Sequence, residues 1–239
     1  MKIFKPHFWK KKYSILSIIL LPISIIIQIL FFIKKNIVKK ENFSVPIICI
    51  GNIYIGGTGK TPLAIKTSMM LKKFNKNPAI IKKLYKNQRD EMDLIKEKTK
   101  NLITGSNRKE AIISAIKKKF NTIILDDGFQ DHSIKKNLNI LCFNSNQLIG
   151  NGLTVPSGPL RENFDSIKNC QIVIINGNPN EEFEKKIKNI SSSISIYYSK
   201  YLPINIKKLE NTNLLAFAGI GNSENFFDLL SNYKLKIKK

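Results

Sequence analysis

Residues 51–62 read Gly-Asn-Ile-Tyr-Ile-Gly-Gly-Thr-Gly-Lys-Thr-Pro, and they follow an apolar run at 45–50. A segment with helical character, 61–74, comes directly after them. This order of strand, glycine-rich turn, Gly-Lys-Thr and helix cradles the phosphates of a nucleoside triphosphate, because glycines let backbone N–H groups approach the oxygens and a helix N-terminus favours an anion. The stretch therefore predicts a P-loop within an α/β fold.

The two residues that end this loop have expected roles. The ammonium of Lys60 would reach the β- and γ-phosphates, and the hydroxyl of Thr61 would ligate Mg²⁺. The strict pattern G-x-x-x-x-G-K-[ST] requires glycine at position 54, where this chain has Tyr54. The alternative is a glycine-rich turn that ends in Gly-Lys-Thr by chance, but the flanking strand and helix favour the P-loop.

A second motif, Thr-Ile-Ile-Leu-Asp-Asp-Gly-Phe-Gln at 122–130, is an apolar run that leads into two carboxylates. In P-loop proteins an acidic residue at the end of a neighbouring strand holds Mg²⁺. Neighbouring side chains at a strand end point in different directions, so we expect only one of Asp126 and Asp127 to face the metal. An Asp-Asp-Gly turn that merely caps the strand is the alternative.

The remaining chain alternates apolar runs with amphipathic segments, which predicts a parallel sheet with helices on both faces. The expected strands are 45–50, 78–81, 122–125, 138–143, 171–175, 194–198 and 214–218. The expected helices are 61–74, 90–98, 108–120, 180–190 and 224–230.

The N-terminal residues 14–33 contain no charged side chain and have lysines on both flanks. As a helix they would span about 30 Å, the thickness of a hydrocarbon core. The run is long for a secretory signal and lacks a cleavage site after it. A spanning helix and a helix embedded in one leaflet both fit this pattern. Because a P-loop must meet ATP, we expect the globular part to be cytoplasmic.

The composition favours anionic partners, since 40 basic and 17 acidic residues give a net charge of +23. The lysines are spread along the chain and no aromatic RNA-binding signature or Cys/His finger is present, so nucleic-acid binding is not expected. The three cysteines, Cys49, Cys142 and Cys170, are far apart in sequence. This spacing predicts buried thiols in a reducing compartment.

Four pieces together resemble the tetraacyldisaccharide 4′-kinase family, the lipid A 4′-kinases of Gram-negative bacteria. They are the P-loop at 51–62, Asp-Asp-Gly-Phe-Gln at 126–130, Gly-Asn-Gly at 150–152 with Pro-Ser-Gly-Pro-Leu-Arg-Glu at 156–162, and Ala-Gly-Ile-Gly at 218–221 with Phe-Phe-Asp-Leu-Leu at 226–230. The resemblance covers essentially the whole chain, and the family has the same stretched loop around position 54.

The resemblance implies transfer of the γ-phosphate of ATP to the 4′-hydroxyl of a lipid A disaccharide 1-phosphate at the cytoplasmic face of the inner membrane. It also implies two α/β domains. We therefore expect a membrane anchor at 1–40, a P-loop kinase core at 41–207 and the start of a truncated second domain at 208–239. The implied partners are the lipid substrate and anionic membrane lipids, with neither nucleic acid nor an obligate protein partner.

The resemblance also assigns roles to single residues. Lys60, Asp127 and Asp90 are the expected catalytic residues, with Asp90 as the base that accepts the proton of the sugar hydroxyl. The triphosphate would be wrapped by Tyr54, Ile55, Gly56, Gly57, Thr58, Gly59, Lys60 and Thr61. Mg²⁺ would be held by Thr61, Asp127 and Gln130, and the substrate would be touched by Asn151, Arg161 and Glu162. An alternative for Asp90-Glu91 is a solvated helix N-terminus, where acids are favoured.

The chain departs from the family pattern in three places. Residues 82–86 read Lys-Lys-Leu-Tyr-Lys where the family has Arg-Gly-Tyr, so only Tyr85 matches. Asp131 separates Gln130 from His132, and the late Asp-His segment of the family has no counterpart before Lys239. Two alternatives to an active lipid kinase therefore remain: a truncated relative that binds ATP but turns over poorly, and a membrane-associated P-loop ATPase that acts as a switch.

Overall fold

The computed structural model describes residues 6–11, 14–84, 89–203, 206, 209, 212–218, 223–233, 235 and 237–238. The expected match at Tyr85 and the glycines of the 218–221 motif lie outside these residues. All statements on the structure below refer to the described residues.

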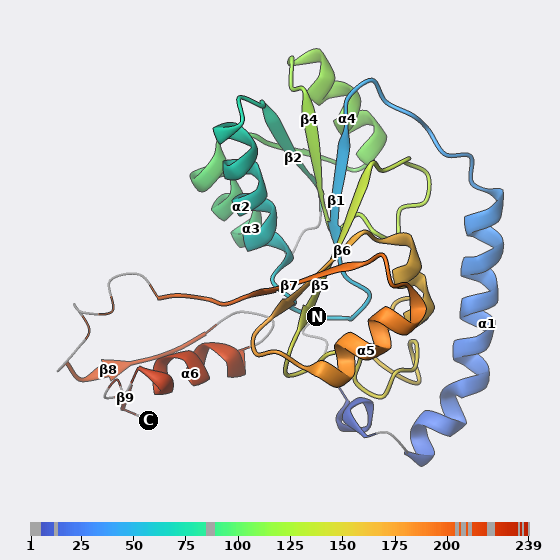
Figure 1. Ribbon diagram of the computed structural model, residues 1–239, viewed down its shortest axis with the longest axis vertical. Coiled ribbons are helices and arrows are strands. Elements are labelled where there is room, and N and C mark those ends of the chain that lie inside the picture. Colours follow the sequence, from blue (N-terminus) through green and yellow to red (C-terminus); the bar gives the residue numbers. More distant parts are fainter. Residues whose placement is uncertain are drawn as a thin grey trace.

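A seven-stranded sheet forms the centre of the molecule, with all of its neighbouring strands parallel (Figure 1). The strand order is β3-β2-β4-β1-β5-β6-β7. The prediction of a parallel sheet is confirmed, and six expected strands lie within two residues of their predicted bounds. The strands are β1 (Ile47–Gly51), β2 (Pro78–Lys83), β3 (Leu102–Gly105), β4 (Thr122–Asp126), β5 (Leu138–Asn144), β6 (Ile172–Asn176) and β7 (Ser195–Ser199).

Strand β3 was not predicted from the sequence. It is four residues long, lies at the edge of the sheet and is only half-buried along its length. A strand of this kind lacks the long apolar run that marks a strand buried on both faces.

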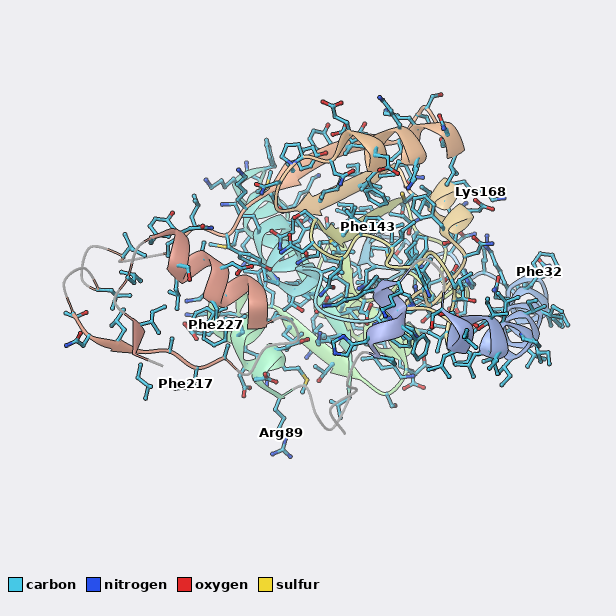
Figure 2. The ribbon with its side chains drawn as sticks, turned by 90° about the horizontal axis from the view of Figure 1, so that it is seen from below. Phe32, Arg89, Phe143, Lys168, Phe217 and Phe227 are labelled. Carbon is cyan, nitrogen blue, oxygen red and sulfur yellow. The ribbon has the colours of Figure 1, made fainter. Side chains whose placement is uncertain are left out.

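Helices cover both faces of the sheet, as expected. The helices α2 (Lys60–Lys73) and α3 (Arg89–Thr99) pack on one face, against alternate strand residues such as Ile80 and Ile124. The other face is covered by α4 (Arg108–Lys117), α5 (Glu181–Ile190) and the 3-10 helix η2 (Phe164–Asn169), against Ile81, Leu125 and Phe143. Figure 2 shows Phe143 inside the body of the molecule. The central strands thus send successive side chains to two separate cores.

The three cysteines are buried and form no disulfide bond among the described residues. Burial raises the pKa of the Cys49 thiol to about 11 and that of the Cys142 thiol to about 12. Both groups are therefore protonated near neutral pH and pack as small apolar side chains.

The N-terminal helix α1 (Ile15–Ile37) follows the 3-10 helix η1 (His7–Lys10) and runs beside the body of the molecule (Figure 1). It continues through Pro22 and ends four residues beyond the charge-free run. Among the described helices it is the one that is long and apolar enough to cross a membrane. Few residues in its most apolar part are buried inside the protein. Its apolar side chains are largely exposed, and Phe32 lies at the outer edge of the molecule in Figure 2.

A polar stripe fastens α1 to the loop that follows β5. Ser17, Ser24 and Gln28 are spaced so that they share one helix face. The Ser24 hydroxyl lies 3.0 Å from the carbonyl oxygen of Thr154, and the amide of Gln28 donates to the Thr154 hydroxyl at 2.6 Å. The two serines are buried although most of the surrounding helix is exposed. The helix therefore has a polar face toward the protein and an apolar face away from it.

The described C-terminal residues form a separate small unit. A two-stranded parallel sheet pairs β8 (Leu214–Leu215) with β9 (Ile237–Lys238), and α6 (Ser223–Asn232) lies between them in sequence (Figure 1). The strand expected at 214–218 is shorter than predicted, while the helix expected at 224–230 is present.

Candidate functional site

The glycine-rich loop lies between the end of β1 and the start of α2, at the carboxyl edge of the sheet. Gly59 caps α2 with a φ of 88°, a left-handed conformation that favours glycine. A Cβ at this position would also come within 3.0 Å of the side chains of Asn176 and Tyr201. The glycine is thus required both by the backbone turn and by the close approach of two neighbouring segments.

The buried side chain of Asn52 holds the glycine-rich loop together through hydrogen bonds. This side chain is fully buried, and its amide nitrogen lies 2.6 Å from the Tyr54 carbonyl oxygen, 3.2 Å from the Gly56 carbonyl oxygen and 3.1 Å from the Thr58 hydroxyl. This one side chain gathers three points of the loop. The sequence motif included Asn52 but gave it no role, because its contacts depend on how the loop folds back.

The 159–161 segment is fastened to the same loop. The backbone N–H of Ile55 donates to the carbonyl of Pro159 at 2.9 Å, and that of Arg161 donates to the carbonyl of Ile53 at 2.7 Å. These two bonds bring the Pro-Leu-Arg-Glu motif, about a hundred positions away in sequence, beside the P-loop. The guanidinium of Arg161 then reaches the residue that follows β4.

A cavity of about 640 Å³ opens above this edge. Tyr54 and Ile55 are not among its lining residues, and the Tyr54 side chain is 3% exposed within the core. Of the expected phosphate loop, residues 56–61 line the cavity, whereas the Tyr54 side chain turns into the core. The residues that line the cavity include Gly56, Gly57, Thr58, Gly59, Lys60, Thr61, Lys82, Glu91, Asp127, Arg161, Asn176 and Tyr201.

Asp127 lies between two cationic side chains. Its carboxylate is 3.6 Å from Lys60 Nζ and accepts from Arg161 Nη1 at 2.9 and 3.0 Å. Burial on its own raises the pKa of Asp127, but the charges of Lys60 and Arg161 outweigh it and hold this pKa below its usual value. The carboxylate therefore stays ionised and keeps both cations at the cavity wall.

Asp126 belongs to a different group of charges. The Thr61 hydroxyl donates to Asp126 Oδ2 at 3.0 Å and lies 3.4 Å from Glu91 Oε2. Lys82 Nζ lies 2.7 Å from the same Asp126 oxygen and 2.6 Å from Glu91 Oε2. Thr61 and Asp127 are the expected Mg²⁺ ligands, but the carboxylate that bonds the Thr61 hydroxyl is that of Asp126. The reason is alternation: Ile124 faces α2 and α3, so Asp126 two residues later faces them too, whereas Asp127 follows the strand end with a φ of 61°.

The oxygen atoms of this second group fit a hard divalent cation. Asp126 is 0% exposed, and its Oδ1 has no hydrogen-bond partner among the described residues. A buried carboxylate oxygen without a partner is costly unless a cation or an ordered water satisfies it. Carboxylate and hydroxyl oxygens are also the ligands that Mg²⁺ prefers.

Gln130 and Glu162 lie behind Arg161 and do not line the cavity. The Gln130 amide donates to the carbonyl of Asn52 at 2.9 Å, and its oxygen accepts from Arg161 at 3.4 Å. Burial raises the pKa of Glu162, and His132 Nε2 lies 3.8 Å from its carboxylate. Burial and the nearby Lys35 charge lower the pKa of His132 to about 4. The imidazole is therefore neutral near pH 7.

Asp131, inserted between Gln130 and His132, points elsewhere. Its carboxylate pairs with Arg108 at 3.3 Å and accepts from the Ser133 hydroxyl at 2.7 Å. Arg108 also donates to the backbone carbonyl of Asp127 at 2.7 Å, so this insertion supports the turn that carries Asp127. The sequence analysis assigned no role to Arg108, since its partners lie 19 and 23 positions away.

Asp90 and Asn151 lie away from the cavity wall. Asp90 is exposed in the first turn of α3, next to the cavity-lining Glu91, and the preceding Arg89 points away from the body in Figure 2. The Asn151 side chain bonds Ser17 at 3.2 Å, the Ser157 carbonyl at 3.0 Å and the Leu153 amide at 3.1 Å. It thus joins the 150–158 loop to α1 rather than facing the cavity.

Several residues that line the cavity were not predicted from the sequence. Lys82 was considered only within the 82–86 stretch that differs from the family's Arg-Gly-Tyr. For Asn176 and Tyr201, the one feature that points to a site is their position near strand ends. Burial raises the pKa of Tyr201, whose hydroxyl bonds the Asn176 side chain. In a parallel sheet the carboxyl ends of the strands lie at one edge, where ligands bind. Polar residues near the end of each strand could therefore have been predicted to line the site.

A family model described as tetraacyldisaccharide-1-P 4′-kinase matches residues 16–239 of this chain. The chain is 47% identical over 243 residues to the tetraacyldisaccharide 4′-kinase of Pelagibacter ubique, covering 99% of this chain and 76% of that protein. It is 31% identical over 257 residues to the protein of the same name from Rickettsia canadensis, again covering 99% of this chain and 76% of the relative. The chain is thus shorter than these relatives.

Among solved structures, the chain is similar to one described as the "apo" form of LpxK from Aquifex aeolicus in complex with ATP. The TM-score is 0.70 at 22% sequence identity, over 94% of this chain and 80% of that one. This similarity supports the shared fold.

Proposed function

The chain belongs to the tetraacyldisaccharide-1-phosphate 4′-kinase family, and from this premise we propose that its cavity transfers the γ-phosphate of ATP to the 4′-hydroxyl of a tetraacyldisaccharide 1-phosphate. The chain is therefore a lipid A kinase. The observation that carries the proposal is that Lys60, Thr61 and the carboxylates of Asp127 and Glu91 all line one cavity at the carboxyl edge of the sheet.

The P-loop supplies the phosphate site. Backbone N–H groups of residues 56–61 and the N-terminal end of α2 would surround the phosphates, because both favour an anion. Lys60 would neutralise charge on the γ-phosphate as it transfers. Asp127, which is also paired with Arg161, holds this lysine at the cavity wall, and Arg161 would contact substrate phosphate or sugar oxygens.

Mg²⁺ would be held by Thr61 and Asp126, with Glu91 beside them, while Asp127 and Gln130 face the Lys60 and Arg161 side. When bound, the ion neutralises charge on the phosphates and orients them. The partnerless oxygen of Asp126 supports this assignment.

Asp90 is the proposed base. It lies next to the cavity-lining Glu91 in the first turn of α3 and is not itself a lining residue, so it would accept the proton of a sugar hydroxyl that the substrate brings to it from outside the cavity. A positioned base contributes roughly 10²–10⁴-fold to such a step. Its exposure fits an acceptor substrate that enters from outside.

The helix α1 would hold the enzyme at a membrane surface. Its polar stripe is occupied by the protein, so the exposed apolar face is the one that would contact lipid. Because α1 runs beside the body, we propose that it lies in one leaflet rather than crossing the bilayer (Figure 1). Lysines at both ends would then face anionic headgroups of the cytoplasmic leaflet, where ATP is available.

The test replaces Lys60 by Ala, with Lys66→Ala on the exposed face of α2 as the matched control. We expect K60A to lower transfer of label from radiolabelled ATP to the disaccharide 1-phosphate by about 10²–10³-fold and to weaken ATP binding, because the phosphates lose their cation. K66A should match the wild type in both assays.

Unchanged ATP affinity and unchanged lipid labelling in K60A would refute the proposal. A wild-type chain that binds ATP but labels no lipid would instead favour the alternative of a relative that only binds the nucleotide.

A further inference from the structure

Lys82 is a buried lysine that the motif analysis left without a role. It lies near the end of β2, directly opposite Asp126 of β4 in the register of the sheet. Its side chain is 4% exposed, yet it lines the cavity. Lysine is rarely buried to this degree unless its charge is paired.

The Lys82 ammonium contacts two carboxylates from different elements. Asp126 comes from the end of β4 at 2.7 Å, and Glu91 comes from the first turn of α3 at 2.6 Å. Both carboxylates also lie within 3.4 Å of the Thr61 hydroxyl in the first turn of α2. The ammonium therefore connects the sheet to the start of α3, and the two carboxylates connect this pair to Thr61 at the start of α2.

The charge of this lysine is maintained by its partners. The pair of short contacts is charge-assisted on both sides, and such bonds are stronger than neutral ones. The link is consequently suited to hold a helix end in place.

Glu91 is the part of this arrangement that depends most on Lys82. Its side chain is 44% exposed, and the described contacts that fix it are those with Lys82 and Thr61. Asp126, in contrast, is enclosed by the sheet and α2. Loss of the ammonium would thus release the first turn of α3 before it disturbs β4.

We propose that Lys82 is a positioning residue: through Glu91 it fixes the first turn of α3, including the neighbouring Asp90, against the cavity and keeps Glu91 beside Thr61. The kinetic part of this inference rests on the proposed function, whereas the structural part concerns the protein without any ligand. The two parts are tested separately.

The structural part is tested by hydrogen exchange of the free protein, in the absence of nucleotide and metal. Glu91→Gln removes the bond from Glu91 to Lys82 and leaves Asp126 paired, so it should fold even where Lys82→Ala, which leaves the buried Asp126 carboxylate without its cation, is destabilised. We expect faster exchange in the first turn of α3 in both variants and unchanged exchange in α4. Asp93→Asn is the matched control, since Asp93 is an exposed acid on the same helix whose ion pair with Lys96 is 3.9 Å long.

The kinetic part compares kcat with the KM for ATP. We expect K82A and E91Q to lower kcat by about 10–100-fold, because small displacements of reacting groups are costly. The KM for ATP should stay near the wild-type value, since Lys60 and the P-loop are intact. The double variant should be no slower than K82A alone, because both changes break one link.

Chemical rescue separates the ammonium from mere packing. Ethylammonium should restore kcat in K82A, whereas tetramethylammonium, which carries the charge but no N–H donor, should not. A loss of kcat that ethylammonium does not restore would assign the effect to packing and overturn the proposal.

Two further outcomes would overturn it. One is exchange in the first turn of α3 that is the same in E91Q, K82A and the wild type. The other is a loss of ATP affinity in K82A that equals the loss of kcat, which would make Lys82 a phosphate ligand. If instead no variant and not even the wild type phosphorylates the lipid, the proposed function fails while the exchange result still decides the positioning role.

Discussion

Asp126 and Asp127 are adjacent in sequence but belong to different groups of charges. Asp126 faces α2 and α3 and contacts Thr61 and Lys82, whereas Asp127 contacts Lys60 and Arg161. The division follows from the alternation of side chains along β4 and from the left-handed turn at Asp127. The two carboxylates can therefore serve two functions, one toward a metal ion and one toward the P-loop lysine.

This division predicts different metal dependence for two matched variants. Asp126→Asn should raise the Mg²⁺ concentration needed for half-maximal activity by about 10–100-fold, because a charged oxygen is lost from the metal site. Asp127→Asn should lower kcat through Lys60 and Arg161 while its Mg²⁺ requirement stays close to that of the wild type. Titration of activity against Mg²⁺ and of Mn²⁺ binding by electron paramagnetic resonance measures both.

Thermal unfolding serves as the control for this comparison, since Asp126 is fully buried. The opposite result, in which only Asp127→Asn changes the Mg²⁺ requirement, would indicate that Asp127 rather than Asp126 is the metal ligand.

At the scale of single elements, α1 has two faces with different tasks. Ser24 and Gln28 bond the 154–157 segment, and the backbone N–H of Ser157 donates to Ser24 at 3.0 Å. The side chains on the other face are large, apolar and exposed. A helix that is apolar almost all round normally lies inside a protein or a bilayer, so we propose that the exposed face of α1 lies in lipid.

Separate substitutions should therefore separate stability from membrane binding. Ser24→Ala should lower the free energy of unfolding by about 1–3 kcal/mol, because buried partners of the hydroxyl lose their bonds. It should leave binding to lipid vesicles unchanged. Ile26→Ser, on the exposed face, should weaken vesicle binding by roughly ten-fold or more, as expected from about 1.5–3 kcal/mol for an isoleucine side chain.

Ile26→Ser should leave unfolding in detergent solution nearly unchanged, because Ile26 is 58% exposed. Chemical denaturation and vesicle co-sedimentation measure the two effects. A loss of vesicle binding in Ser24→Ala without a loss of stability would contradict the assignment of the faces.

At the scale of the whole molecule, we propose three units: the anchor at 1–40, the P-loop core at 41–207 and a further unit that begins at 208. The separation of the β8–β9 sheet from the seven-stranded sheet supports this division. The cavity nevertheless includes Phe226 and Leu229 of α6, so the C-terminal unit contributes to its wall. The net charge of +23 belongs to the chain as a whole rather than to any one motif.

This charge predicts salt-dependent attachment to anionic membranes. Each lysine near an anionic surface contributes about 1 kcal/mol, and screening shortens the range of this attraction from about 10 Å at 0.1 M salt to about 3 Å at 1 M. Binding to vesicles that contain phosphatidylglycerol should therefore fall as NaCl is raised. Binding to phosphatidylcholine vesicles should be weaker and nearly independent of salt, because only α1 contributes.

Co-sedimentation at low and high NaCl measures both cases. Equal binding to the two kinds of vesicle at low salt would exclude an electrostatic contribution to attachment.

The sequence alone determined the parts of this protein that depend on local order. The P-loop, the parallel sheet and the long apolar helix were all predicted, because each is written as a continuous pattern of glycines, apolar residues or helical spacing. Strand β3 was not predicted, because it is a short, half-buried edge strand with little apolar periodicity. The hydrogen bond between Thr61 and Asp126 was not predicted, since the sequence does not state which face of β4 meets α2.

The tertiary structure decided which distant residues meet. Lys82, Glu91 and Asp126 gather around Thr61 because the register of β2 and β4 and the docking of two helices bring their side chains to one face. Likewise, Asn151 serves α1 rather than the cavity because the loop that carries it packs on the helix. These contacts between residues that are distant in sequence depend on the packing of whole strands and helices, so no local sequence pattern predicts them.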